Sequence, residues 1–362
     1  MSKLRNKVLL GILTALISVI LLSGCRKEVP YVILDCDMGC MNDDMLALSM
    51  LIKAEEAGKL KIAGITLEGG NNFIDASYMN NGEEQKSEID ASKEFLEKIN
   101  RNDIPVIKGT DWPVGYENQP EVLAEFYDGL EYMPGQDEYG AIHYFRNLKS
   151  GKFTDSDDAA DFMVREADKH PGNIVLIAIG PTMNIARAIR KDPSFAGKIS
   201  QIYYMGGSFE NKNVITPCAE YNVVYDAASF LTCITAGFKE QYISSSEIEA
   251  YINKEIADEI EKTVQKDDKI GQLWVEHYHK VIQDYPYWDP NDAAAFLNPK
   301  DMKTKECYVT VNTDRNDKQY AQTTAISPEE YNGLDDGKKE LYGKVRIITE
   351  ITDFWNTALK YL

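Results

Sequence analysis

The sequence predicts an α/β fold built on a mostly parallel, doubly wound (Rossmann-like) sheet flanked by helices. Short apolar segments rich in β-branched residues alternate with segments of helical spacing along most of the chain. Runs such as 174–179 are apolar throughout, which is typical of parallel strands buried on both faces. No Pro-, Ser- or Gly-rich linker and no repeat divides residues 31–362, so we expect a single domain there.

Each expected element follows from a local pattern. An apolar strand is expected at 31–34, and a helix begins at Asp43 and Asp44 because apolar residues recur after them at helical spacing. Pro171 and Gly172 end a later helix, and Gly180 breaks the strand that follows. The other expected strands are 60–67, 104–107, 174–179, 199–205, 308–312, 320–325 and 344–349, and the other helices are 87–99, 158–170, 183–190, long stretches between 247 and 285, and 353–362.

The most polar and glycine-rich segments come directly after expected strands. They are 35–44, 68–72, 179–182 and 206–222. Because open parallel sheets bind ligands outside the carboxyl ends of their strands, we expect these segments to form one site.

Four carboxylates surround the first strand-to-helix turn. Asp35 and Asp37 end the strand, and Asp43 and Asp44 begin the helix. So many like charges repel one another unless a cation lies among them, and the helix N-terminus supplies only part of that positive charge. Carboxylate oxygens at this density suit Ca²⁺ or Mg²⁺. The alternative is a solvated turn in which each carboxylate has an ordinary strand-end or helix-capping role.

Residues 1–24 have the pattern of a secretory signal peptide. Lys3, Arg5 and Lys7 precede an apolar run at 8–22 that is too short to span a bilayer comfortably. The run ends in Leu22-Ser-Gly-Cys25, which resembles a bacterial lipoprotein signal and implies cleavage before Cys25 and lipid on its thiol. We therefore expect an exported protein, anchored to a bacterial cell membrane through Cys25 and a short tether at 25–30. The alternative is an ordinary cleaved signal with a chance cysteine.

Charge and cysteine content limit the partners. Without residues 1–24 the chain has 36 basic and 58 acidic residues, a net charge of −22. Such a surface repels nucleic acid, so a small-molecule ligand is expected and a polynucleotide is not. The cysteines after Cys25 are odd in number and scattered, and no Cys-x-x-Cys pair suggests zinc.

Six motifs, in the right order, resemble those of the inosine–uridine-preferring nucleoside hydrolase family, from about residue 31 to the end of the chain. They are Asp35-Cys-Asp37-Met-Gly39 with Asp43-Asp44, Gly70-Asn71, Ile104-Pro-Val-Ile-Lys-Gly109, Gly180-Pro-Thr-Met-Asn-Ile-Ala186, Met205-Gly-Gly with Thr216-Pro-Cys-Ala-Glu220-Tyr-Asn222, and Asp289-Pro290 with Pro299. The resemblance implies a calcium-dependent enzyme that hydrolyses the N-glycosidic bond of nucleosides to free base and ribose.

The resemblance also implies the metal ligands. Asp37 would bind Ca²⁺ and act as the general base on the attacking water. Asp44, Asp289 and the main-chain carbonyl of Ile179 would complete the protein ligands. Asp292, three residues along, is a rival for Asp289.

Further residues are implied at the sugar. N-glycoside cleavage passes through an oxocarbenium-like sugar, which nearby carboxylates stabilise. By resemblance, Asp43 and Asn222 hold the 2′- and 3′-hydroxyls, Glu220 and Asn213 hold the 5′-hydroxyl, and Asn71 lies beside the ring. Asn211 is a rival for Asn213, because one extra residue separates Asn213 from Glu220.

The leaving-group end departs from the family pattern. Trp288 stands where a His often precedes the late Asp-Pro and protonates the departing base, and a His–Gly element after the third strand is missing. Trp288 either stacks on the base or is a core tryptophan. His277, His279, Tyr285 and Tyr287 are the candidates for that end, although each also has an ordinary structural interpretation.

Two other functions fit parts of the sequence. A phosphatase of the haloacid dehalogenase type also has Asp-x-Asp after its first strand, but Gly39 stands where that family needs Thr or Val, and Asp289 would have no role. A lipid-anchored protein that binds nucleosides or sugars without turnover fits the anchor and the missing His, but it has little use for a water-activating cation. Base preference and homo-oligomer formation are left open by the sequence.

Overall fold

A nine-stranded sheet forms the centre of the computed structural model, which describes residues 28–38, 43–69, 87–117, 119–134, 154–278 and 285–361. Its strands are β1 (Tyr31–Cys36), β2 (Lys61–Leu67), β3 (Val106–Lys108), β4 (Ile174–Ala178), β5 (Ile199–Met205), β6 (Gln241–Ser244), β9 (Met302–Val311), β10 (Thr323–Ile326) and β11 (Gly343–Ile351). Their order is β10-β9-β11-β6-β5-β4-β1-β2-β3. From β3 to β11 neighbouring strands pair in parallel, and β9 pairs antiparallel with β11 and β10.

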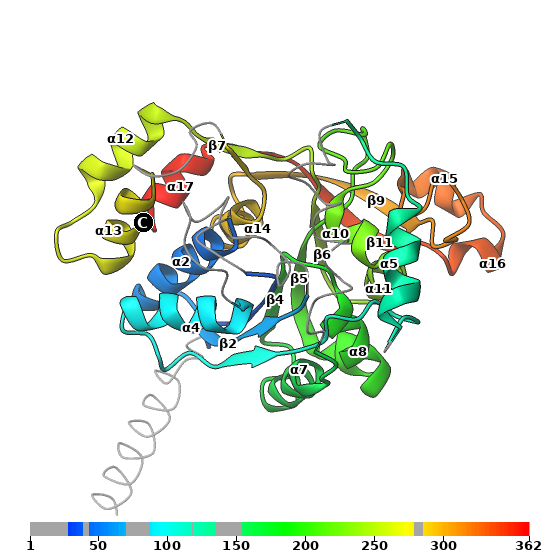
Figure 1. The fold of residues 1–362 in the computed structure, drawn as a ribbon, viewed down its shortest axis with the longest axis horizontal. Coiled ribbons are helices and arrows are strands. Elements are labelled where there is room, and N and C mark those ends of the chain that lie inside the picture. The colour runs from blue at the N-terminus through cyan, green and yellow to red at the C-terminus, as the bar shows by residue number, and fades with distance from the viewer. Residues whose placement is uncertain are drawn as a thin grey trace, which may run out of the picture.

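Helices cover both faces of the sheet (Figure 1). One face carries α2 (Asp43–Glu56), α4 (Glu88–Lys98), α12 (Lys254–Thr263), α13 (Lys269–Tyr278), α14 (Pro290–Leu297) and α17 (Phe354–Lys360). The other carries α5 (Pro120–Asp128), α7 (Asp158–Lys169), α8 (Met183–Lys191), α9 (Phe195–Lys198), α10 (Tyr221–Tyr225) and α11 (Ala227–Thr235). The short helices α15 (Pro328–Asn332) and α16 (Asp336–Lys339) lie beyond the antiparallel edge, and β7 (Ala250–Ile252) pairs antiparallel with β8 (Tyr285–Tyr287).

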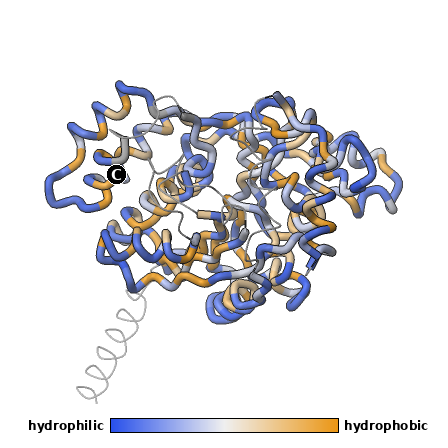
Figure 2. Tube along the Cα trace, viewed as in Figure 1, coloured by the Kyte–Doolittle hydropathy of each residue, from blue (hydrophilic) through white to orange (hydrophobic). Residues whose placement is uncertain are grey.

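Each face of the sheet has its own apolar core. Ile33 and Leu34 are neighbours in β1 and point to opposite faces, because successive side chains alternate along a strand. Both are fully buried. Apolar segments accordingly gather on the strands and on the inner sides of the helices, while polar segments lie outside (Figure 2). The doubly wound, mostly parallel sheet predicted from the sequence is confirmed.

Several boundaries differ from the predictions. The strand expected at 104–107 begins only at Val106, because Pro105 has no N–H to donate to a neighbouring strand. The stretch between 247 and 285 contains β7 as well as α12 and α13, so it is not wholly helical as predicted. Strand β9 begins six residues earlier than expected. The prediction missed its first half because that half is exposed and charged and has no apolar pattern. Among the described helices, none combines the length and apolar character that crossing a membrane requires.

Candidate active site

The carboxyl ends of the parallel strands meet at one edge of the sheet, where the strand order reverses between β1 and β4. Such a reversal opens a crevice that commonly holds the ligand. Asp37 follows β1 directly and Ile179 follows β4. Gly180 comes so close to β1 that a Cβ on it would lie 3.0 Å from the main-chain N of Asp37. The segments that follow β1 and β4 therefore lie side by side at this point.

Three carboxylates converge beside the crevice. Asp43, Asp44 and Asp289 each have an oxygen within 4.8 Å of the other two. Asp43 and Asp44 lie in the first turn of α2, and Asp289 is the N-cap residue of α14, which packs against α2. Two helix N-termini thus direct partial positive charge at these carboxylates. Hard oxygen donors at this spacing fit Ca²⁺ or Mg²⁺.

Asp37 is buried and shares the electrostatic environment of this cluster. Burial raises the pKa of Asp37 well above its ordinary value, and the charges of Asp44, Glu88 and Asp43 raise it further. Burial likewise raises the pKa of Asp289, with the charges of Asp43, Asp44 and Asp37 adding to the effect. A divalent cation among these carboxylates would allow all of them to ionise.

Asp35 is not part of the cluster of Asp43, Asp44 and Asp289, although the sequence analysis grouped it with the carboxylates of the first strand-to-helix turn. Its Oδ1 accepts hydrogen bonds from the Thr66 hydroxyl (2.6 Å) and from Nδ2 of Asn184 (3.0 Å). Glu68, also fully buried, lies beside it. Burial raises the pKa of Asp35 to about 6 against these hydrogen bonds. Burial and the charge of Asp35 raise the pKa of Glu68 well above its ordinary value.

The predicted sugar residue Asn222 lies against Ile179. Its Nδ2 donates to the carbonyl oxygens of Ile179 and Met205, both at 3.1 Å. Because both amide hydrogens are used on the main chain, Oδ1 of Asn222 is the atom left for a ligand. The structure therefore brings together the residue that follows β4 and a residue of α10, which the sequence assigned to one site.

Glu220 is held in place by the main chain. It is the N-cap residue of α10, and its carboxylate accepts from the N–H groups of Asn222 (2.6 Å), Gly207 (2.9 Å) and Val223 (3.3 Å). Burial raises the pKa of Glu220 to about 7, although these hydrogen bonds lower it. Glu220 can therefore change protonation near neutral pH.

Trp288 connects the acidic cluster to the segment around Asn213. Its main-chain N–H donates to Oδ2 of Asp43 (3.2 Å), and its indole N–H donates to the carbonyl oxygen of Ser246 (3.2 Å). Nδ2 of Asn213 donates to the same carbonyl at 2.9 Å. The half-buried ring of Trp288 also packs against the apolar core on the α2 face.

Comparison with known proteins identifies the family. The sequence model described as inosine-uridine preferring nucleoside hydrolase matches residues 32–354. The chain belongs to this family. The phosphatase interpretation is therefore not retained.

Relatives within the family are distant in sequence and share the fold. A probable uridine nucleosidase 2 from Oryza sativa subsp. japonica is 30% identical over 206 residues, which cover 57% of this chain and 53% of that protein. This chain thus matches about half the length of the rice relative. The pyrimidine-specific ribonucleoside hydrolase RihB of Escherichia coli (strain K12 / DH10B) is 25% identical over 79% of this chain and 84% of its own. The solved plant nucleoside hydrolase PpNRh1 has a TM-score of 0.64 at 22% identity, covering 92% and 97% of the two chains.

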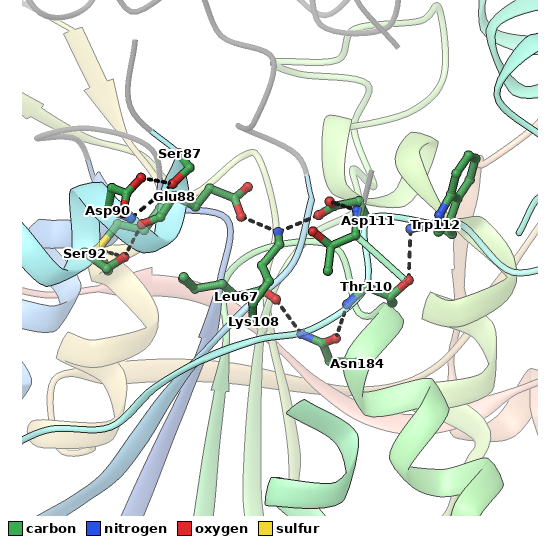
Figure 3. Close-up of polar contacts among 12 residues, drawn as sticks. Leu67, Ser87, Glu88, Asp90, Ser92, Lys108, Thr110, Asp111, Trp112 and Asn184 are labelled. Atoms are coloured by element: carbon green, nitrogen blue, oxygen red, sulfur yellow. Dashed lines mark hydrogen bonds and ion pairs between the residues drawn. The ribbon is translucent and has the colours of Figure 1, made fainter. Parts of the chain in front are cut away.

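The sequence interpretation missed a half-buried lysine at the same edge of the sheet. Figure 3 shows the ammonium of Lys108, at the end of β3, between Glu88 of α4 and Asp111 of the following loop. Its Nζ donates to Oε2 of Glu88 (2.7 Å) and to Oδ1 of Asp111 (2.5 Å). Burial alone would lower the pKa of Lys108, but the charges of Glu88 and Asp111 raise it above its ordinary value. Lys108 therefore stays charged and balances carboxylates close to Asp37.

Asn184 joins the ends of the neighbouring strands. Its Nδ2 also donates to the carbonyl of Leu67 (3.2 Å), and its Oδ1 accepts from the N–H of Thr110 (3.1 Å), as Figure 3 shows. A Cβ on Gly109 would lie 1.9 Å from that oxygen, so the glycine is required for this contact. Gly109 and Asn184 stand in two of the predicted motifs, but neither motif indicates that they meet.

Some predicted residues lie outside the described part of the chain or are placed apart from the site. Cys25, Asn71 and the side chains of His277, His279 and Tyr285 are outside it, while Tyr287 is buried in the core on the α2 face.

Of the two aspartates that compete for the role of late metal ligand, Asp289 joins the carboxylate cluster and Asp292 does not. The carboxyl of Asp292 is fully buried, and within the described residues no hydrogen-bond partner reaches it. Cys36, Cys218, Cys233 and Cys307 are free thiols.

Removing the Lys108 charge should destabilise the fold. Lys108→Met would leave Glu88 and Asp111 as buried carboxylates without their cation, which we expect to lower the free energy of unfolding by about 3–5 kcal/mol. Urea denaturation measures this loss. Lys98→Met is the matched control, because Lys98 pairs with Glu94 on the surface of α4. Equal unfolding midpoints for the two variants would contradict the structural role given to Lys108.

Proposed function

We propose that this protein hydrolyses the N-glycosidic bond of ribonucleosides, releasing free base and ribose, with a calcium ion bound at Asp37, Asp44, Asp289 and the carbonyl of Ile179. The observation that carries the proposal is the convergence of Asp43, Asp44 and Asp289 beside Asp37, where the strand order of the sheet reverses. The chain also belongs to the nucleoside hydrolase family. The position of Asp43 in the same cluster makes it a further candidate ligand. The names of the relatives support a ribonucleoside substrate.

Each carboxylate has a separate task in this proposal. Asp37 accepts a proton from the attacking water, because it directly follows β1 beside the carboxylate cluster and a carboxylate there can act as a general base. A bound Ca²⁺ would supply positive charge that lowers the pKa of that water and fixes its position. The carboxylates near the ring stabilise the positive charge that develops on the sugar.

The remaining residues would bind the sugar and the base. Asp43 and Oδ1 of Asn222 accept hydrogen bonds from the 2′- and 3′-hydroxyls, and Glu220 and Asn213 bind the 5′-hydroxyl. Asn71 is proposed beside the ring by family resemblance alone. The ring of Trp288 can offer a face to the base, because its indole N–H is already bonded to Ser246.

A binding protein without turnover is the second candidate. The observation that favours it is Trp288 at the position where the family often has the His that protonates the leaving base. Incubation with uridine and with inosine, followed by chromatography of free base, separates the two. Intact nucleoside together with measurable affinity would favour the binder.

We also propose that residues 1–24 are a cleaved signal, that lipid on Cys25 holds the protein on a bacterial membrane through the tether 25–30, and that residues 31–362 act as one domain. The Leu22-Ser-Gly-Cys25 pattern supports this. Labelled fatty acid should be incorporated by the wild type and not by Cys25→Ala. Equal labelling of both proteins would contradict the proposed lipid attachment at Cys25.

Asp37→Asn should abolish catalysis and leave the fold intact. The amide keeps the size of the side chain but cannot take up the proton, so we expect kcat to fall by about 10²–10⁴-fold. Steady-state kinetics measures this, and the melting temperature tests the fold. Asp258→Asn, a partly exposed position on α12, is the control. Wild-type turnover by Asp37→Asn would remove the role of general base from Asp37.

Substrate affinity should depend on the ionisation of Glu220. Its folded-state pKa of about 7 lies above the ordinary 4.5, so its contribution to stability is present at low pH and is lost as pH rises toward 7. The carboxylate formed above pH 7 is the stronger acceptor for a hydroxyl, so KM should fall about fivefold between pH 5.5 and 8.5. Glu220→Gln cannot ionise, and its KM should stay flat. The same pH dependence in both proteins would rule out Glu220 as its source.

A further inference from the structure

The side-chain amide of Asn213 is fixed in one orientation. Its Nδ2 donates to the carbonyl oxygen of Ser246 (2.9 Å) and to Oε2 of Glu249 (2.6 Å). A carboxamide has two N–H donors, and both are used here. A flipped amide would place its oxygen against two acceptors. Oδ1 is therefore the atom that Asn213 can offer to a ligand, and Oδ1 can only accept a hydrogen bond.

The carboxylate of Glu249 holds the amide of Asn213 in this orientation. One of its oxygens accepts from Asn213, and the other pairs with Nζ of Lys212 at 2.6 Å. Its side chain is 11% exposed. Burial alone would raise the pKa of Glu249, but hydrogen bonds from Lys212, Tyr251 and Asn213 outweigh it and lower the pKa. Glu249 is thus a carboxylate, which makes it a stronger acceptor than a neutral group.

The surrounding segment does not depend on Glu249 for its position. Oε1 of Glu247 accepts from the Ser208 hydroxyl (2.5 Å) and from the N–H groups of Phe209 and Glu210, both at 2.9 Å. The hydroxyl of Ser246 donates to the carbonyl of Lys212 at 2.6 Å. These bonds tie 208–212 to 246–247. A change at Glu249 therefore acts chiefly on the side chains of Asn213, Lys212 and Tyr251, not on the path of the chain.

Asn213 belongs to the same polar network as the site. The Ser246 carbonyl that it contacts also accepts from Trp288, whose main-chain N–H holds Asp43. Gly207, at the start of the same segment, donates to Glu220. Asn213 and Glu220 thus lie in one loop, which joins β5 to α10, and both present oxygen acceptors.

We propose that Glu249 is a positioning residue that fixes Asn213 as a hydrogen-bond acceptor and thereby selects nucleosides with a free 5′-hydroxyl. This inference rests on the proposed function, which assigns Asn213 and Glu220 to the 5′ end of the sugar. A 5′-hydroxyl donates one hydrogen bond to this pair of acceptors. A 5′-deoxy sugar has no donor, and a 5′-phosphate dianion brings negative charge toward Glu220 and Glu249.

The test compares substrates that differ only at the 5′ position. Affinity by calorimetry, and kcat and KM where turnover occurs, are measured for uridine, 5′-deoxyuridine, inosine and 5′-deoxyinosine. Glu249→Ala should weaken binding of uridine and inosine roughly two- to tenfold and leave binding of the 5′-deoxy compounds and kcat nearly unchanged. Glu249→Gln, which keeps an acceptor oxygen, should recover part of the loss. Glu255→Ala, an exposed change on α12, is the control.

Asn213→Gly supplies a second, independent variant. Asn213 has φ +54°, a left-handed conformation that glycine adopts without strain, so the change removes the amide and keeps the backbone. It should give the same 5′-hydroxyl-specific loss, and combining it with Glu249→Ala should add little. An equal loss for hydroxyl and deoxy compounds, or no loss, would overturn the inference. Absence of turnover with the binding pattern intact would instead overturn the hydrolase proposal alone.

Discussion

Mutual repulsion among buried carboxylates is the constraint on which the rest of the site depends. Asp37, Asp43, Asp44 and Asp289 lie together where the strand order reverses, and burial and each other's charge raise the pKa of Asp37 and Asp289. The N-termini of α2 and α14 offset part of this charge. Lys108 offsets another part by neutralising charge on Glu88 and Asp111. What is left is a concentration of hard oxygen donors that suits a divalent cation.

The fold delivers these groups through close main-chain contacts rather than through long side chains. Gly180 lets the end of β4 approach Asp37, and Gly109 leaves room for Asn184 to join β2, β3 and the loop after β3. Asn222 and Asn213 each use their amide hydrogens on protein acceptors, which leaves oxygens for a ligand. The proposed sugar site is thus rich in acceptors, which suits a sugar whose hydroxyls donate hydrogen bonds.

Local sequence patterns predicted well those features of the fold that depend on a single strand or helix. The doubly wound sheet follows from apolar strands such as 174–178, and the acidic start of α2 follows from Asp43 and Asp44. Contacts between distant segments carry no such local pattern. Lys108 ends an apolar strand and pairs with Glu88, twenty residues away, and Glu249 holds Asn213 across thirty-six residues. Asp35 looked like a cation ligand because it is close to Asp37 in sequence. It still lies within β1, however, in register with Thr66 of β2, and its carboxylate accepts hydrogen bonds from Thr66 and Asn184.

Calcium titration calorimetry on the purified protein, before and after treatment with EDTA, tests the central claim most directly. We predict that each chain binds one Ca²⁺, that the chelator lowers the melting temperature, and that Asp289→Asn weakens binding at least about tenfold, since it removes one charged ligand. A chain that binds no divalent ion, and whose melting temperature EDTA leaves unchanged, would contradict the account.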